Sequence, residues 1–295
     1  MNTGTDSFAV FILTHGRPNN ITTLRTLDRQ GYTGPVYLVV DNEDADLPEY
    51  RRLHGDKVIV FDKAAVAARI DEGDNFRDRR AVIYARNACF DIARDLGIEY
   101  FLELDDDYKE IQHKFTATLA YGHWRLVTDL DRLFATVLRY YVSTPAVTIA
   151  MAQGGDFIGG GASGAAEKLW LKRKAMNSFF CSVHRPFTFF GRINEDVHTY
   201  VTLGNRGALF LTFFSNTIEQ HDTQQVAGGM SDLYAEQGTY RKSFYTVMYA
   251  PFCVTIRQVG IHHPRIHHRI SWRDAVPCIL RETTRKALPQ YPGIE

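Results

Sequence analysis

Residues 100–108, YFLELDDDY, lead from an apolar run into three consecutive aspartates, and this pattern decides the predicted fold. A short apolar run such as 100–104 is typical of a strand that is buried on both faces of a sheet. Three similar runs lie upstream: FAVFIL at 8–13, VYLVV at 36–40 and VIVF at 58–61. Segments 19–30 and 81–96 have helical spacing. Repeated strand–helix–strand units predict an α/β fold with a mostly parallel sheet.

The remainder of the chain has a less regular pattern. Helices are predicted at 128–142, 195–203 and 239–249, and strands at 147–152, 208–214 and 253–259. No internal repeat, long linker or low-complexity segment interrupts the sequence. We therefore expect a single domain over residues 1–295.

Composition narrows the classes of function. The 295 residues are 45% hydrophobic, which is enough for a sizeable core. Lys+Arg and Asp+Glu both number 34, so the zero net charge excludes a uniformly positive surface for nucleic acid but not a local basic patch. Cys89, Cys181, Cys253 and Cys278 form no CxxC motif, which favours free thiols in a cytoplasmic protein over a zinc ribbon. We also expect no signal peptide and no membrane span.

Polar clusters follow three of the predicted strands at the point where each strand ends. They are Thr14–Arg17, Asp41–Asp44 and Asp105–Asp107. In parallel α/β sheets, ligands bind outside the carboxyl ends of the strands. Each cluster alone is compatible with ordinary turn chemistry, but three clusters at one edge favour a ligand site.

The acidic cluster Asp105–Asp107 indicates the kind of ligand. Three adjacent carboxylates repel one another, and a hard divalent cation such as Mg²⁺ or Mn²⁺ relieves this repulsion while it binds substrate phosphates. An acidic turn without a ligand is the alternative. The chain has no GxxxxGK[ST] motif, and THGRP rather than GxGxxG follows the first strand, which argues against a P-loop kinase and a Rossmann dehydrogenase. The ligand that remains as a candidate is a nucleotide diphosphate held by a metal ion.

In order along the chain, these motifs resemble the TET-associated glycosyltransferases, phage-associated enzymes of the GT-A fold that are proposed to glycosylate hydroxymethylated pyrimidines in DNA. The similar stretches are FILTHGRP, YLVVDNED, YARNACFDIA, YFLELDDDY, GTYRKSFYTVM and RIHHRISW. The resemblance covers roughly residues 8–280. It implies a GT-A-like fold with a Rossmann-like nucleotide-binding half at 1–110 and an irregular acceptor-binding half at 111–295.

The same resemblance implies a metal-dependent hexosyl- or pentosyltransferase. The expected donor is a nucleotide-diphosphate sugar, with a UDP-sugar first, and the expected cofactor is Mn²⁺ or Mg²⁺. The expected acceptor is the hydroxyl of a hydroxymethylated pyrimidine, with 5-hydroxymethylcytosine first, in bacteriophage DNA. The product would protect phage DNA from host restriction, and the expected location is the cytoplasm of the infected bacterium.

The resemblance also implies roles for individual residues at the donor. The residues expected to bind the nucleotide sugar are Thr14, Arg17, Asp41, Arg86, Asn87, Asp105 and Asp106. Structural roles are the alternative for three of them. Arg17 and Arg86 could form ion pairs with the acidic strand ends, and Asn87 could pin a loop.

The resemblance further implies a set of metal ligands. Asp107 and Asp105 are expected to bind the cation, with Asp106 able to share either role. His221, in a polar loop before two glycines, is expected to complete the coordination shell of the metal ion. His267 and His268 are the alternative candidates for this ligand. A single histidine is more often a satisfied surface or core residue than a ligand.

The sequence Asn194-Glu195-Asp196 opens a predicted helix and supplies the candidate catalytic base. In inverting enzymes of the GT-A fold, a carboxylate at a comparable place removes the proton from the acceptor hydroxyl. A carboxylate at a helix N-terminus is also a good cap, and capping predicts a lowered rather than a raised pKa. Both interpretations stay open for Glu195, and we favour Asp196 as the base because it lies next to the more buried turn.

A basic stretch surrounds Trp170 and supplies the candidate DNA-binding residues Lys172, Arg173 and Lys174. Basic residues interleaved with aromatics suit a phosphate backbone and stacked bases, although a solvated charged face is the usual outcome. Only the resemblance points to DNA. The alternatives are a glycan or protein acceptor, a non-catalytic sugar-nucleotide or DNA-binding module, and a nucleotidyltransferase that releases pyrophosphate.

Overall fold

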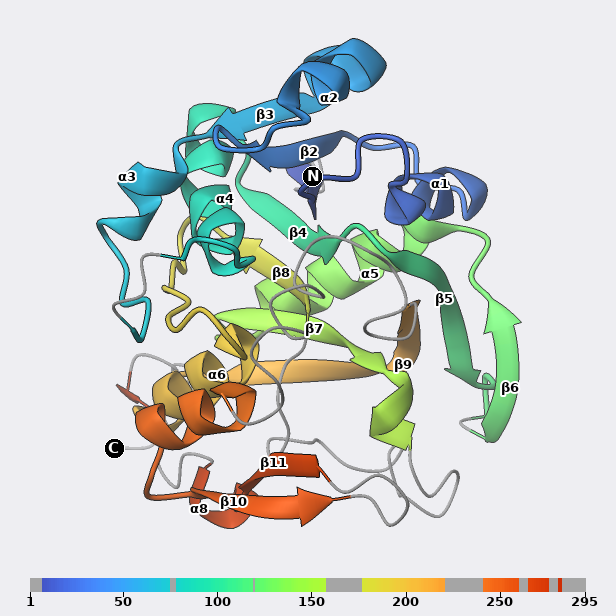
Figure 1. Ribbon diagram of the computed structural model, residues 1–295. Coiled ribbons are helices and arrows are strands. Elements are labelled where there is room, and N and C mark those ends of the chain that lie inside the picture. The colour runs from blue at the N-terminus through green and yellow to red at the C-terminus, as the bar shows by residue number, and fades with distance from the viewer. Residues whose placement is uncertain are drawn as a thin grey trace, which may run out of the picture.

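The computed structural model describes residues 7–74, 78–118, 120–157, 177–220, 241–259, 265–275 and 281–282. Its strands are β1 (Phe8–Leu13), β2 (Val36–Asp41), β3 (Val58–Phe61), β4 (Tyr100–Asp105), β5 (Tyr108–Phe115), β6 (Tyr121–Leu126), β7 (Thr148–Gln153), β8 (Ser178–Ser182), β9 (Phe210–Gln220), β10 (Val254–Val259) and β11 (Arg265–Ile270). Nine of them form one sheet in the order β3-β2-β1-β4-β8-β7-β9-β5-β6, and β10 pairs with β11 in a separate hairpin (Figure 1).

The strand directions confirm the expected α/β class with a mostly parallel sheet. β3, β2, β1 and β4 pair in parallel, as do β7 and β9. The pairings of β8 and β5 with their neighbours are antiparallel. Within the described part of the large sheet, β8 and β5 are therefore the strands that run against the others.

Strand β1 shows why its sequence is apolar without interruption. Ala9 and Phe11 face one hydrophobic cluster, whereas Val10 and Ile12 face another on the opposite side of the sheet. Successive side chains of a strand point to opposite faces, so a strand covered on both sides needs an apolar residue at every position.

Helices and short 3₁₀ segments cover the two faces of the sheet. They are α1 (Thr22–Arg29), α2 (Leu47–His54), η1 (Gly55–Lys57), α3 (Lys63–Ala67), α4 (Ile83–Asp95), α5 (Leu130–Ser143), η2 (Gly154–Phe157), α6 (Glu195–Asn205) and α8 (Trp272–Ala275). A further helical segment spans 241–249. α4 packs into the cluster that contains Phe11, and α5 packs into the cluster that contains Ile12. Figure 1 shows these two helices on opposite faces of the sheet.

The structure adds elements that the apolar periodicity did not predict. β5 and β6 follow the acidic turn, and β8 inserts between β4 and β7. The segment 265–270, which contains His267 and His268, is a strand that pairs antiparallel with β10 in a hairpin. Among the described residues, no helix is long and apolar enough to cross a membrane.

Candidate functional site

The three polar clusters lie together at one edge of the sheet, as the strand order predicts. β1 pairs in parallel with β4 so that Leu13 lies opposite Asp105, and β2 lies on the other side of β1. Residues that immediately follow these strands therefore emerge side by side. The hydroxyl of Thr14 donates to Asp106 Oδ2 at 2.8 Å, which joins the first cluster to the acidic one.

Asp106 is held by the segment that follows β1. Its Oδ1 accepts a hydrogen bond from Arg17 Nη1 at 2.8 Å, and its Oδ2 accepts from Thr14. The hydroxyl of Tyr50 lies 2.8 Å from that of Thr14 and accepts a hydrogen bond from the Arg17 backbone NH. Both oxygens of the buried Asp106 thus contact protein groups, so this aspartate fixes the turn rather than presenting a bare carboxylate. The ion-pair alternative for Arg17 is confirmed.

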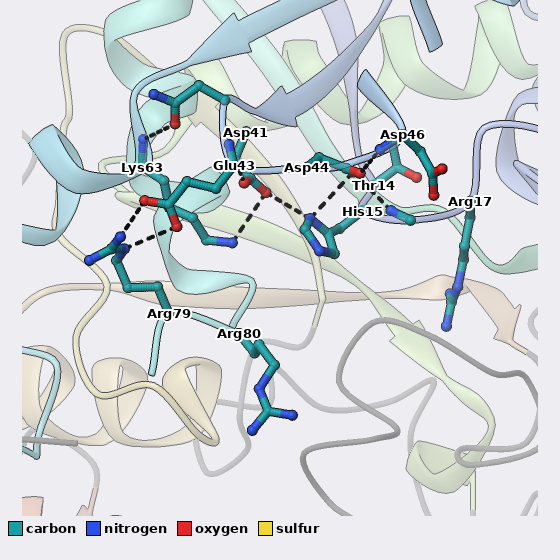
Figure 2. Close-up of polar contacts among 12 residues, drawn as sticks. Thr14, His15, Arg17, Asp41, Glu43, Asp44, Asp46, Lys63, Arg79 and Arg80 are labelled. Atoms are coloured by element: carbon teal, nitrogen blue, oxygen red, sulfur yellow. Dashed lines mark hydrogen bonds and ion pairs between the residues drawn. The ribbon is translucent and has the colours of Figure 1, made fainter. Parts of the chain in front are cut away.

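Asp41, at the end of β2, is surrounded by two basic side chains that the sequence analysis did not single out. Its Oδ2 lies 2.8 Å from His15 Nδ1 and 3.2 Å from Lys63 Nζ, as Figure 2 shows. Burial favours a higher pKa for Asp41, but the contacts with His15 and Lys63 outweigh it and lower the pKa. The hydrogen bond to Asp41 in turn raises the pKa of His15. His15 belongs to the turn motif THGRP, which was the available signal.

Further arginines lie beside this group. Arg79 forms an ion pair with Glu43, and Arg80 pairs with Asp78. In Figure 2 the side chains of Arg17, His15 and Arg80 extend to the same side of the strand ends. The edge of the sheet therefore carries basic groups next to the acidic turn, and each of them contacts a carboxylate.

Asp107 differs from its neighbours in its contacts. Gln220 Nε2, at the end of β9, donates to Asp107 Oδ2 at 3.2 Å. Asp107 Oδ1 is buried and has no hydrogen-bond partner within the described residues. A buried carboxylate oxygen without a partner is costly. This atom, close to the charge of Asp105, fits the oxygen ligand of a hard divalent cation.

The described residues contain no group of three or more His, Cys, Asp or Glu side chains that could hold a metal ion by themselves. Asp105 and Asp107 would thus form only part of a shell, as is usual for Mg²⁺ bound with substrate phosphates. His221, the expected third ligand, lies outside the described residues, and so do Lys172, Arg173 and Lys174.

The competing histidines lie on β11. His267 Nδ1 lies 2.6 Å from the backbone oxygen of His268, and His268 Nδ1 lies 3.5 Å from Asn194 Nδ2. His268 is therefore beside the residue that precedes α6. Their role as metal ligands stays a prediction.

Arg86 occupies the centre of a buried group of carboxylates. Its Nε donates to Glu195 Oε1 at 3.0 Å and its Nη2 donates to Asp105 Oδ1 at 3.0 Å. Its Nη1 lies 3.7 Å from Glu103 Oε2. The ion-pair alternative for Arg86 is thereby confirmed, whereas its expected contact with the donor stays a prediction. Glu103 was missed because it stands within the apolar run of β4, and an acidic residue inside such a run was the available signal.

One guanidinium among three carboxylates leaves an excess of negative charge. Burial raises the pKa of Asp105 to about 7 and that of Glu103 to about 8, although Arg86 opposes both shifts. Burial also raises the pKa of Glu195. For Glu195, the lowered pKa expected from capping alone is therefore wrong, because removal from water outweighs the helix N-terminus.

Asn87 pins the loop before α6. Its side-chain nitrogen donates to the backbone oxygen of Phe189 at 2.9 Å, and its side-chain oxygen accepts from the backbone NH of Phe189 at 3.0 Å. The loop-pinning alternative for Asn87 is confirmed, and its contact with donor stays a prediction.

The N-terminus of α6 presents both candidate bases. Glu195 and Asp196 are its first two residues and both are buried. Asn194 adopts a left-handed conformation with φ 59° and makes no side-chain cap; its Nδ2 instead donates to the Lys242 backbone oxygen at 2.8 Å. The charge of Asp196 contributes to the raised pKa of Tyr108, the residue that follows the acidic turn. The start of α6 is thus close to the end of β4.

His198, also on α6, makes the stability depend on pH. It is fully buried, its ring lies 4.6 Å from that of Tyr249, and burial lowers its pKa to about 4. The unfolded chain binds a proton below about pH 6.5, while the folded protein does not. We expect this group to remove about 2 kcal/mol of stability between about pH 6.5 and pH 5, at about 1.4 kcal/mol per pH unit.

Urea unfolding of the wild type and His198→Gln at these two pH values checks this expectation. The buried carboxylates around Arg86 have raised pKa values and act in the opposite direction, but they are present in both proteins. The difference between the two slopes therefore isolates His198. Parallel slopes would show that His198 is protonated in the folded state.

Comparison with known proteins adds a sequence family to this geometry. A family model described as TET-Associated Glycosyltransferase matches residues 8–229. No curated protein sequence matches the chain. Among solved structures, the mannosyltransferase PcManGT from Pyrobaculum calidifontis, in complex with GDP-Man and Mn²⁺, aligns at a TM-score of 0.44 and 12% identity. That alignment covers 72% of this chain and 56% of the other, so this chain spans little more than half of that protein.

Glucosyl-3-phosphoglycerate synthase from Mycobacterium tuberculosis, in complex with Mg²⁺ and uridine diphosphate, aligns at a TM-score of 0.45 and 8% identity. The alignment covers 90% of this chain and 87% of the synthase.

Proposed function

This chain belongs to the TET-associated glycosyltransferase family, and from that premise we propose that it transfers a sugar from a nucleotide-diphosphate donor to a hydroxymethylated pyrimidine in phage DNA. The acceptor we propose first is 5-hydroxymethylcytosine. The observation that carries the proposal is the buried Asp107 Oδ1, which has no hydrogen-bond partner among the described residues. It lies at the same edge of the sheet as the basic groups of Figure 2. A diphosphate and its cation need both kinds of group.

The donor nucleotide would lie across the ends of β1 and β2. Asp41 Oδ1 accepts from the Glu43 backbone NH, and Asp41 Oδ2 faces His15 and Lys63. This support holds the carboxylate in one orientation, so that a remaining lone pair of Asp41 can accept a hydrogen bond from the base or ribose. Arg17 and Arg80 extend to the same side of the strand ends, where they suit the negative charge of the diphosphate.

Asp107 and Asp105 are the residues we propose for the divalent cation, Mn²⁺ or Mg²⁺. A cation held there would act as a Lewis acid and neutralise charge on the departing diphosphate. Asp106 is less suited, because Thr14 and Arg17 engage both of its oxygens. We propose His221 as a further ligand on the resemblance alone.

Asp196 is the base we propose for the acceptor hydroxyl. Its neighbour Glu195 accepts from Arg86 Nε at 3.0 Å within a buried ion pair, so its carboxylate is committed to the protein. Successive residues of a helix differ by about 100° around the axis, so the side chains of Glu195 and Asp196 leave α6 in different directions. Asp196 would take the proton from the hydroxymethyl oxygen as that oxygen attacks the sugar.

The DNA acceptor rests on the family. An enzyme that modifies a base must flip it out of a duplex or act on a single strand. Because the chain has no net charge, we expect DNA binding that is modest and sensitive to salt. Lys172, Arg173 and Lys174 are the residues we propose for the DNA backbone.

A donor screen with Mn²⁺ tests the proposal. The protein is incubated with UDP- and GDP-sugars and two DNAs that differ only in cytosine or 5-hydroxymethylcytosine, and the nucleosides are analysed by mass spectrometry. We expect a hexose or pentose mass on the hydroxymethylated base alone. Donor hydrolysis without DNA modification would exclude the DNA acceptor and point to a glycan or protein. Released pyrophosphate would indicate a nucleotidyltransferase, and neither donor binding nor hydrolysis would contradict the metal–diphosphate site.

A further inference from the structure

Arg86 is a fully buried cation that connects two segments far apart in the sequence. It is 1% exposed, and rings of Phe179 and Phe189 lie 5.2 and 5.8 Å from its guanidinium carbon. Its partners Asp105 and Glu195 end β4 and begin α6. The guanidinium therefore joins the metal-binding edge of the sheet to the helix that carries the proposed base.

This geometry is specific to arginine. A guanidinium presents its NH groups in a rigid planar fork, so Nε and Nη2 can each hold a different carboxylate at 3.0 Å. A lysine ammonium is a single point of charge on a flexible chain and does not reproduce this fixed geometry. The aromatic rings of Phe179 and Phe189 leave the fork little freedom to turn.

The position of Arg86 also argues against contact with the donor. A ligand at the surface could reach the guanidinium only by displacing residues that cover it, because the side chain has almost no exposed surface. Its carboxylate partner Asp105 is more accessible, with 21% of the side chain exposed. Arg86 thus lies behind the residues that face the ligand.

We propose that Arg86 is a positioning residue that fixes the first turn of α6 against the end of β4, and so sets the placement of Asp196 relative to Asp105 and Asp107. The inference rests on the proposed function. A displacement of a reacting group by about 1 Å can reduce the rate by about 10²-fold. Arg86 then acts on turnover through Glu195 and Asp105 without touching the substrate.

Arg86→Lys tests this inference, with Arg94→Lys as the matched control on the same helix. Arg94 forms an exposed ion pair with Asp91, so its variant should behave as the wild type. For Arg86→Lys we expect kcat to fall by on the order of 10²-fold, with unchanged affinity for metal-free UDP by calorimetry. Hydrogen exchange should accelerate at the first turn of α6 and at residues 105–108. Lost UDP affinity, or wild-type kcat and exchange, would overturn the inference.

If Arg86→Lys does not fold, a second pair of variants tests the positioning role of Arg86. Glu195→Gln keeps an acceptor for Arg86 Nε, and Glu195→Ala removes it. A lower kcat in the alanine variant alone, at unchanged UDP affinity, supports the positioning role. Wild-type kcat in both, or equal loss in both, contradicts it. If the wild type transfers no sugar, the proposed function fails, while hydrogen exchange and UDP binding still test the role of Arg86.

Discussion

Asp107→Ala is expected to slow sugar transfer severely while leaving the fold intact. The substitution removes Oδ1, the buried oxygen that has no hydrogen-bond partner among the described residues, together with the acceptor for Gln220. Loss of a ligand to a Lewis-acid cation removes several kcal/mol of stabilisation from the departing diphosphate, which corresponds to roughly 10²- to 10⁴-fold in kcat. Transfer assays across a range of Mn²⁺ concentrations measure the loss.

Thermal unfolding with and without Mn²⁺ plus UDP supplies a second readout for Asp107. The wild type should be stabilised by the added ligands, and Asp107→Ala should not. Asp95→Ala is the matched control, because Asp95 is exposed at the end of α4. Full activity in Asp107→Ala would show that Asp107 is not a ligand of the cation.

Asp196→Asn is expected to lower kcat by on the order of 10²- to 10⁴-fold, the usual contribution of a general base. The amide keeps the shape of the side chain but cannot accept the proton of the acceptor hydroxyl. Glu195→Gln is the matched neighbour, and we expect a much smaller loss because the amide oxygen still accepts from Arg86. The KM values for donor and acceptor should change little in either variant.

The pH dependence of kcat separates the two carboxylates further. The acidic limb of the wild-type profile should change in Asp196→Asn and keep its position in Glu195→Gln, because only the first variant removes the proposed base. A larger loss of kcat in Glu195→Gln than in Asp196→Asn would show that Glu195, and not Asp196, is the base. Steady-state rates across the acid range, with hydroxymethylated DNA in excess, provide the measurement.

The apolar runs of the sequence predicted the central strands closely. β1 and β3 match their predicted bounds, and β2 and β4 each extend one residue beyond theirs. The reason is local: a strand buried on both faces requires apolar side chains at every position, and the sequence records this directly. The meeting of Thr14 with Asp106 also followed, because the carboxyl ends of parallel strands share one edge.

The strands after the acidic turn could not be placed in the same way. β8 inserts antiparallel between β4 and β7, and β5 pairs with β9 about a hundred residues away. Pairing across such separations depends on which edges remain open once the rest of the sheet has formed. No local period in the sequence encodes that choice.

The division between sequence and tertiary structure is clearest at the candidate site. The sequence by itself determined the α/β class, the family and the residue types that gather at the carboxyl edge, because local periodicity and short motifs carry that information. Only the tertiary structure decided which carboxylates are committed to the protein. Asp106 faces Arg17, and Glu195 faces Arg86 across 109 positions. The charge, burial and freedom of a side chain depend on neighbours that the fold brings together, and the sequence does not place those neighbours next to one another.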